Sequence, residues 1–103
     1  MASKIRVLII DDSPLMRRLL EEIFGGSPHF EVAGSAEDAN SARKLIPRTS
    51  PDVITLDIKM PDTDGLSFLD EIIRKHAIPV VMVSFFTQEG AEAALSALEM
   101  GAV

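Results

Sequence analysis

The sequence predicts an α/β fold with a parallel sheet, and the prediction rests on the pattern of apolar residues. Four short apolar runs are separated by segments of helical length, and three of these runs are apolar without alternation. Continuous runs of this kind are typical of strands buried on both faces of a sheet. Strand and helix patterns that alternate along a chain favour parallel strands joined by right-handed crossovers. The four predicted strands are Ile5–Ile10, Phe30–Gly34, Val53–Leu56 and Val80–Val83.

Most of the predicted strands end in polar side chains. The first run stops at Asp11 and Asp12, the third at Asp57 and the fourth at Ser84. The second run, Phe30–Gly34, alternates instead, which favours an edge strand with one wetter face. The polar ends matter because ligands of open α/β sheets bind at the carboxyl ends of the strands.

The segment after the first predicted strand carries both a start and a stop signal for a helix. Ser13 is expected to be the N-cap, with Pro14 in the first helical position. Gly25 and Gly26 are expected to end the helix. Its apolar stripe, which should face the core, consists of Met16, Leu19, Leu20, Ile23 and Phe24.

Three further helices are predicted from the same kinds of signal. Asp38 is expected to cap the second, and Pro47 should end it because proline removes a helical hydrogen bond. Asp64 is expected to cap the third. Thr87 is expected to cap the fourth, with Gly101 as its exit.

Length and composition restrict the class of protein. A chain of 103 residues fits one domain, and 47% hydrophobic with 25% charged residues is a globular composition. The net charge of −6 argues against nucleic acid and anionic membranes as partners. The absence of cysteine excludes disulfides and a thiolate zinc site. The first apolar run is too short for a signal peptide or a membrane span, so a cytoplasmic location is expected.

The residues that end the predicted strands would share one pocket if the first, third and fourth strands are neighbours. Carboxylates of Asp11, Asp12 and Asp57 held close together would repel one another and recruit a cation. Mg²⁺ takes carboxylate oxygens, waters and phosphate oxygens, and a carboxylate can attack phosphorus to form an acyl phosphate. The alternative is that these residues only start turns and cap helices, as Asp and Ser often do at strand ends.

Four blocks of the sequence resemble response-regulator receiver domains, in the order and spacing of that family. The resemblance covers essentially the whole chain, so residues 1–103 are expected to form one receiver domain, truncated at its C-terminus. It implies a flavodoxin-like three-layer sandwich with a parallel sheet in the order 2-1-3-4, lacking the usual fifth strand and fifth helix. The blocks are Val7–Ser13, Asp52–Asp57, Met60–Gly65 and Pro79–Ser84.

The same resemblance assigns roles to residues. It implies that Asp57 accepts a phosphoryl group from a sensor histidine kinase, and that Asp11 and Asp12 bind Mg²⁺ together with Asp57. The backbone carbonyl of Lys59 is implied as a further metal ligand. Ser84 is implied to contact the bound phosphoryl group and to move on activation. The lysine at 59 departs from the acidic or polar residue expected there, and its ammonium either reaches the site or points to solvent.

A narrower resemblance is to the receiver of chemotaxis protein-glutamate methylesterase, carried by Val81–Ser84, Thr87–Glu92 and Ala97–Val103. In that family the receiver restrains an esterase domain until it is phosphorylated. The chain itself is then a self-phosphorylating switch without a hydrolase domain of its own. A single-domain chemotaxis regulator that binds the flagellar motor is the alternative subfamily.

The point at which the sequence stops is the main departure from the family. The lysine and the aromatic switch residue of a fifth strand are absent, so a second hypothesis is a truncated fragment or chimera half. Such a chain would keep the fold and the metal pocket but could not switch. The fourth predicted strand would also be an open edge without charge or proline, which is a template for pairing. We therefore expect dimerisation through Val80–Val83, exchange of elements with a neighbour, or a fused partner.

Overall fold

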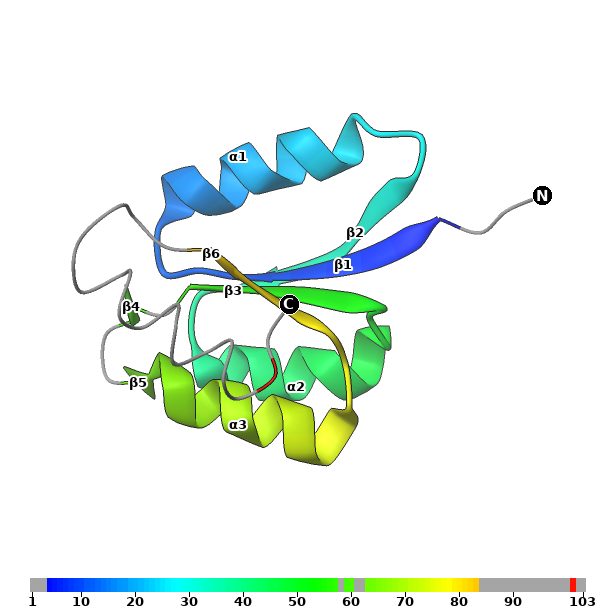
Figure 1. Ribbon diagram of the computed structural model, residues 1–103. Helices are drawn as coiled ribbons and strands as arrows, with labels where there is room; N and C mark the ends of the chain where they lie inside the picture. Colours follow the sequence, from blue (N-terminus) through cyan, green and yellow to red (C-terminus); the bar gives the residue numbers. More distant parts are fainter. Residues whose placement is uncertain (1–3, 58, 61–62, 84–100, 102–103) are drawn as a thin grey trace.

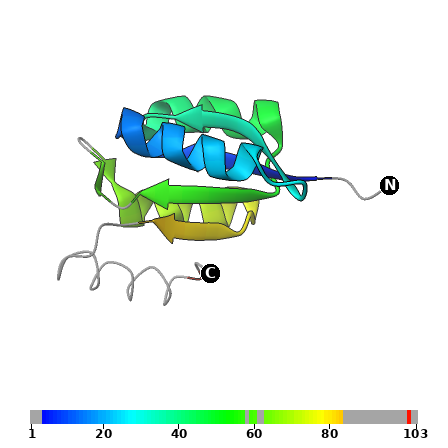
Figure 2. The same cartoon turned by 90° about the horizontal axis from the view of Figure 1, so that it is seen from above.

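The computed structural model describes residues 4–57, 59–60, 63–83 and 101. Its larger sheet has four parallel strands in the order β2-β1-β3-β6 (Figures 1 and 2). This arrangement confirms the predicted α/β fold and the strand order 2-1-3-4 of a flavodoxin-like sandwich. The strands are β1 (Ile5–Ile10), β2 (Phe30–Ala36), β3 (Val53–Asp57) and β6 (Val80–Val83).

Helices cover both faces of this sheet. The helix α1 (Pro14–Gly25) lies on one face, and α2 (Ala39–Thr49) and α3 (Gly65–His76) lie on the other (Figure 1). A short antiparallel pair, β4 (Lys59–Met60) with β5 (Thr63–Asp64), precedes α3. The fourth predicted helix lies outside the described residues. Within the part of the chain that is described, no helix is long and apolar enough to cross a membrane.

The helix α1 begins and ends where the sequence predicts. The Ser13 hydroxyl accepts a hydrogen bond from the N–H of Met16 at 3.2 Å, and Pro14 occupies the first turn, where its missing N–H costs nothing. Gly26 is the C-cap, and its N–H donates to the carbonyl of Glu22 at 3.0 Å. Local capping interactions therefore account for the limits of this helix.

The helix α2 starts as predicted but runs further than expected. The Asp38 carboxylate caps it by accepting a backbone N–H at 2.7 Å. The predicted end at Pro47 is wrong, because the helix continues to Thr49. In the last turn proline removes only its own hydrogen bond, and the N–H of Ser50 still donates to the carbonyl of Ile46 at 3.0 Å.

The hydrophobic core lies between the sheet and the pair of helices α2 and α3. Strand residues on this face are almost fully buried, and each helix supplies its inward-facing stripe. The core residues are Leu8, Ile10, Ala36, Ala39, Ala42, Ile46, Ile54, Leu56, Phe68, Leu69, Ile72 and Val80.

A polar link at the surface fastens α2 to α3. The Arg43 guanidinium donates to both carboxylate oxygens of Glu71, at 2.8 and 3.1 Å. The same guanidinium lies 5.1 Å from the ring centre of Phe68, where a cation is attracted by the aromatic face. The helices α2 and α3 are therefore held together by apolar contacts in the core and by the Arg43–Glu71 ion pair at the surface.

The helix α1 is packed less deeply than the sequence predicts. Met16, Leu20 and Phe24 are half-buried, but Leu19 and Ile23, which were expected in the core, are 47% and 57% exposed. The cause is that α1 packs mainly over β1 and β2, so the flank that bears these two residues is not covered by either strand.

Candidate functional site

Strand register brings the predicted carboxylates together. β1 and β3 are hydrogen-bonded neighbours with Ile10 opposite Leu56, so Asp11 and Asp57 follow at the same edge of the sheet. Asp11, Asp12 and Asp57 each offer a carboxylate oxygen, and these three atoms lie within 4.8 Å of one another. The predicted convergence of the three aspartates is therefore confirmed as geometry.

Asp11 is held on several sides by hydrogen bonds. Its N–H donates to the carbonyl of Ala36 on β2 at 3.0 Å. Its Oδ1 accepts the N–H of Ser13 at 2.9 Å, and its carbonyl accepts Nη1 of Arg17 at 2.7 Å. The residue is only 4% exposed, so its polar groups depend on these partners rather than on water.

The electrostatics of the pocket disfavour a further negative charge. Burial raises the pKa of the Asp11 carboxyl above its ordinary value, and the charge of Asp12 adds to the increase. The Ser13 N–H and the Arg17 guanidinium oppose the increase but do not cancel it. A bound cation would relieve the repulsion among the carboxylates.

The donor set fits Mg²⁺. Asp11 and Asp57 are buried, and Asp12 is half-buried. The three carboxylates at the carboxyl ends of the strands supply hard oxygen ligands. Asp12, the half-buried one, remains within reach of solvent. Magnesium ordinarily keeps several waters and takes only a few carboxylates, so this set is sufficient for it.

Two predicted site residues are not tested by this geometry. Ser84 lies outside the described residues. Lys59 belongs to β4, where its backbone pairs with Asp64 of β5, and its side chain is not among those described. The roles implied for both residues remain predictions.

Arg17 is a residue of the site to which the sequence analysis gave no role. A signal was present, because Arg17 is the first basic residue after the acidic pair and stands in the first turns of the following helix. Helical spacing alone did not show that its side chain turns back to the carbonyl of Asp11.

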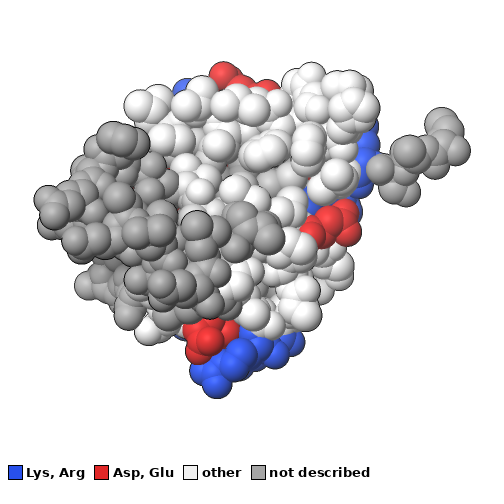
Figure 3. All heavy atoms as spheres, in the orientation of Figure 1, with Lys and Arg blue, Asp and Glu red and all other residues white. Residues whose placement is uncertain are grey.

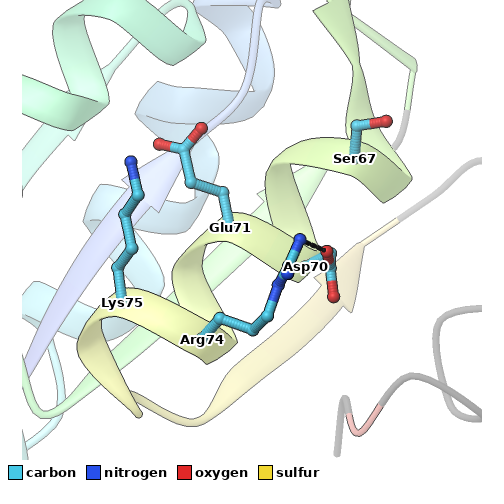
Figure 4. Close-up of a pocket in the computed structure, with 5 residues that line it drawn as sticks. All are labelled: Ser67, Asp70, Glu71, Arg74 and Lys75. Atoms are coloured by element: carbon cyan, nitrogen blue, oxygen red, sulfur yellow. Dashed lines mark hydrogen bonds and ion pairs between the residues drawn. The ribbon is translucent and has the colours of Figure 1, made fainter.

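A separate hollow on α3 is a poorer candidate. It is lined by Ser67, Asp70, Glu71, Arg74 and Lys75, which Figure 4 shows along the outer side of this helix. Its charges are largely paired, because Arg74 donates to Asp70 one turn away and Glu71 binds Arg43. Ion pairs of this kind are ordinary features of an exposed helix.

The fold and the acidic cluster together define a class of protein. A doubly wound parallel sheet that carries aspartates at the ends of its two central strands is the arrangement expected of a receiver domain. The chain belongs to the response regulator receiver domain family, whose model matches residues 7–103.

Curated relatives of the chain include protein-glutamate methylesterases. It is 52% identical to protein-glutamate methylesterase/protein-glutamine glutaminase 2 of Vibrio vulnificus over 103 residues, which is all of this chain and 30% of that protein. It is 48% identical to the corresponding protein of Pyrococcus abyssi over 100 residues, 97% of this chain and 27% of that protein. The chain thus spans less than a third of the length of these relatives.

Solved structures agree with the family assignment. The response regulator domain of Thermotoga maritima CheB has a TM-score of 0.88 and 42% identity, covering 98% of this chain and 75% of that chain. A chain of the CheX–CheY–BeF3–Mg²⁺ complex from Borrelia burgdorferi has a TM-score of 0.80 and 31% identity, covering 94% and 72%. The chain is therefore a receiver domain similar to those of CheB-type response regulators.

Proposed function

We propose that this chain is a phosphorylation switch that acts in the cytoplasm. Asp57 accepts a phosphoryl group from a phosphohistidine of a sensor histidine kinase. Mg²⁺ is held by Asp11, Asp12 and Asp57, with the backbone carbonyl of Lys59 as a further ligand. The observation that carries the proposal is the cluster of three carboxylates within 4.8 Å in a chain of the receiver family.

The proposed chemistry is a transfer between two side chains. A carboxylate oxygen of Asp57 attacks phosphorus, the bond from phosphorus to the histidine nitrogen breaks, and an acyl phosphate forms. Asp57 ends a buried strand and is 7% exposed, so its carboxylate is presented in a fixed place. When bound, Mg²⁺ neutralises negative charge on the transferring group. Ser84 is proposed to donate a hydrogen bond to that group.

The similar proteins support two parts of the proposal, the binding of Mg²⁺ and the regulation of a methylesterase domain. The Borrelia burgdorferi neighbour was solved with BeF3 and Mg²⁺, which favours a magnesium site in the same fold. The curated relatives carry about 70% of their length outside the matched region and are methylesterases by name. We infer that phosphorylation of Asp57 regulates a methylesterase domain that acts on chemoreceptors in a longer protein.

One experiment separates a working switch from a domain that only keeps the fold and the metal pocket. The chain is incubated with acetyl phosphate and MgCl₂ and weighed intact. We expect the mass of one phosphoryl group to be added, to be lost in alkali, and to be absent in Asp57→Asn. Asp70→Asn, an exposed aspartate on α3, is the matched control and should react like the wild type.

Each outcome has a definite reading. An adduct that survives Asp57→Asn would place the acceptor elsewhere. Binding of Mg²⁺ without any adduct would favour the domain that cannot switch. If the adduct forms but no methylesterase domain responds to it, a single-domain regulator becomes the better assignment.

A further inference from the structure

Arg17 contacts the backbone on both sides of Asp12. Its side chain donates from Nη1 to the carbonyl of Asp11 at 2.7 Å, and its backbone N–H donates to the carbonyl of Ser13 at 2.9 Å. The second bond is an ordinary helical one, but the first is made by a side chain and is not required by the helix. One residue thus holds the two carbonyl groups that flank a proposed metal ligand.

The bond from Arg17 adds to a set that surrounds Asp11. The Asp11 N–H is bound to the carbonyl of Ala36, and Oδ1 is bound to the N–H of Ser13. Because Asp11 is buried, its carbonyl would lose a charge-assisted partner if the guanidinium were removed. Loss of that partner would loosen the turn from β1 to α1, on which Asp11 and Asp12 both lie.

We propose that Arg17 is a positioning residue of the acidic cluster. Its guanidinium keeps the turn after β1 in the conformation that directs Asp11 and Asp12 toward Asp57 before a cation binds. The inference rests on the proposed function, because it takes the cluster to be the magnesium site. It assigns Arg17 no direct contact with the metal or the phosphoryl group.

A second effect of Arg17 has the opposite sign, which makes the proposal testable. The positive charge of the guanidinium repels a cation, so removing the charge by itself would tighten Mg²⁺ binding. Removing the hydrogen bond would weaken binding, since groups that orient metal ligands typically contribute 10–100-fold in affinity. The direction of the change therefore shows which effect dominates.

The test compares Arg17→Met with the wild-type chain in titrations with MgCl₂ at constant ionic strength, followed by calorimetry. We expect about tenfold weaker Mg²⁺ binding in Arg17→Met. Arg17→Lys, which keeps the charge and an N–H donor group, should recover part of the affinity. Arg18→Met is the matched control, because Arg18 is exposed on the same helix, and it should bind like the wild type.

A second readout distinguishes positioning from a general loss of structure. The rate of phosphorylation by acetyl phosphate is measured against MgCl₂ concentration. In Arg17→Met we expect the concentration that gives half the maximal rate to rise about tenfold, while the maximal rate stays within about twofold of the wild type. A lower maximal rate with an unchanged magnesium requirement would contradict the proposal.

Other outcomes are equally decisive. Binding of Mg²⁺ by Arg17→Met that is as tight as in the wild type, or tighter, overturns the positioning role. If circular dichroism shows that Arg17→Met does not fold, Arg17→Ala, which also removes both the charge and the donor and favours the helix, provides the same comparison of sign. If the wild-type chain binds no Mg²⁺, both the proposed function and this inference fail. If it binds and the Arg17 variants are unchanged, only this inference fails.

Discussion

At the scale of single residues, Asp11 shows how a buried carboxylate lowers the stability of the fold that holds it. Its pKa is raised above the ordinary value of 3.8, chiefly by burial and then by the charge of Asp12. In the unfolded chain the carboxyl loses its proton at a lower pH than in the folded protein. The free energy of unfolding therefore falls as pH rises from 3.8 to the raised pKa, and it stays lower above that pKa.

The first prediction concerns Asp11→Asn. An amide can still accept the N–H of Ser13 but carries no charge, so without metal this variant should be more stable than the wild type at neutral pH. The advantage should shrink as pH falls through the raised pKa and should vanish only below 3.8, where the wild-type carboxyl is protonated in both states. Urea unfolding at several pH values measures this difference.

Magnesium should reverse the order of stability. With MgCl₂ at a hundredfold excess over its Kd, the wild type should gain about 2.7 kcal/mol, and Asp11→Asn should gain much less. An Asp11→Asn variant that keeps the full magnesium response would show that this carboxylate does not belong to the metal site.

Thr55 is a second residue whose environment predicts a measurable effect. It lies on β3, is 4% exposed, and within the described residues its hydroxyl has no hydrogen-bond partner. Thr55→Val replaces the hydroxyl with a methyl group of similar shape, so the free energy of unfolding should rise by about 1 kcal/mol. Thr49→Val is the control, because the Thr49 hydroxyl donates to the carbonyl of Leu45 at 2.8 Å and its removal should bring no gain. A loss of stability in Thr55→Val would reveal an unseen partner, such as a buried water.

At the scale of elements, two helices are followed by residues in the left-handed conformation. Ser50 follows α2 with φ 46°, and Ala77 follows α3 with φ 52°. In this region a Cβ approaches the following carbonyl oxygen, which glycine avoids. Each position closes its helix through a backbone bond, and the N–H of Ala77 donates to the carbonyl of Ile73 at 3.2 Å.

We therefore expect Ala77→Gly to stabilise the domain, although glycine usually weakens a structure. Relief of the left-handed strain should exceed the added entropy of the unfolded chain and raise the free energy of unfolding by about 0.5–1 kcal/mol. Lys44→Gly, at an exposed position inside α2, should instead cost about 1 kcal/mol. Thermal melts of both variants decide the point, and a destabilised Ala77→Gly would contradict the strain argument.

At the scale of the whole molecule, the described residues include exposed apolar side chains on both β6 and α1. Among the described strands, β6 pairs only with β3, and its Val81 is 40% exposed. Leu19 and Ile23 of α1, the helix that packs on one face of the sheet, are also exposed. Where Figure 3 is not grey, it shows mainly uncharged surface on this face, with charged residues toward the rim. Large exposed apolar patches and open strand edges both favour association.

The 103-residue chain is accordingly expected to self-associate at micromolar concentration. Val81→Lys places a charge on β6 and should weaken association at least about tenfold, or 1.4 kcal/mol. Asn40→Lys, on the exposed side of α2, should leave association unchanged. Sedimentation equilibrium measures the association of both variants. A wild-type chain that is monomeric and melts in one sharp cooperative transition would show that the domain is stable without a partner, which would contradict this prediction.

Local interactions account for the features that could be predicted from the sequence alone. The caps at Ser13 and Asp38, the apolar strands and the aspartates at their ends depend on neighbours within a few residues. These signals were sufficient for the four parallel strands and the three described helices, although they did not predict the short pair β4–β5. With the family resemblance they indicated the strand order and the acidic pocket. The residue types and their places at strand ends made Asp11, Asp12 and Asp57 candidates for one cluster if their strands are neighbours, and the family resemblance supplied that strand order.

The tertiary structure decided what depends on contacts between distant segments. The exposure of Leu19 and Ile23 follows from where α1 sits on the sheet, which helical periodicity does not specify. The helix α2 continues past Pro47 because proline removes only one helical hydrogen bond, and the bond from the N–H of Ser50 to the carbonyl of Ile46 is still made. The position of the Arg17 guanidinium depends on how β1 enters α1, because a long side chain can reach many partners and only packing selects one.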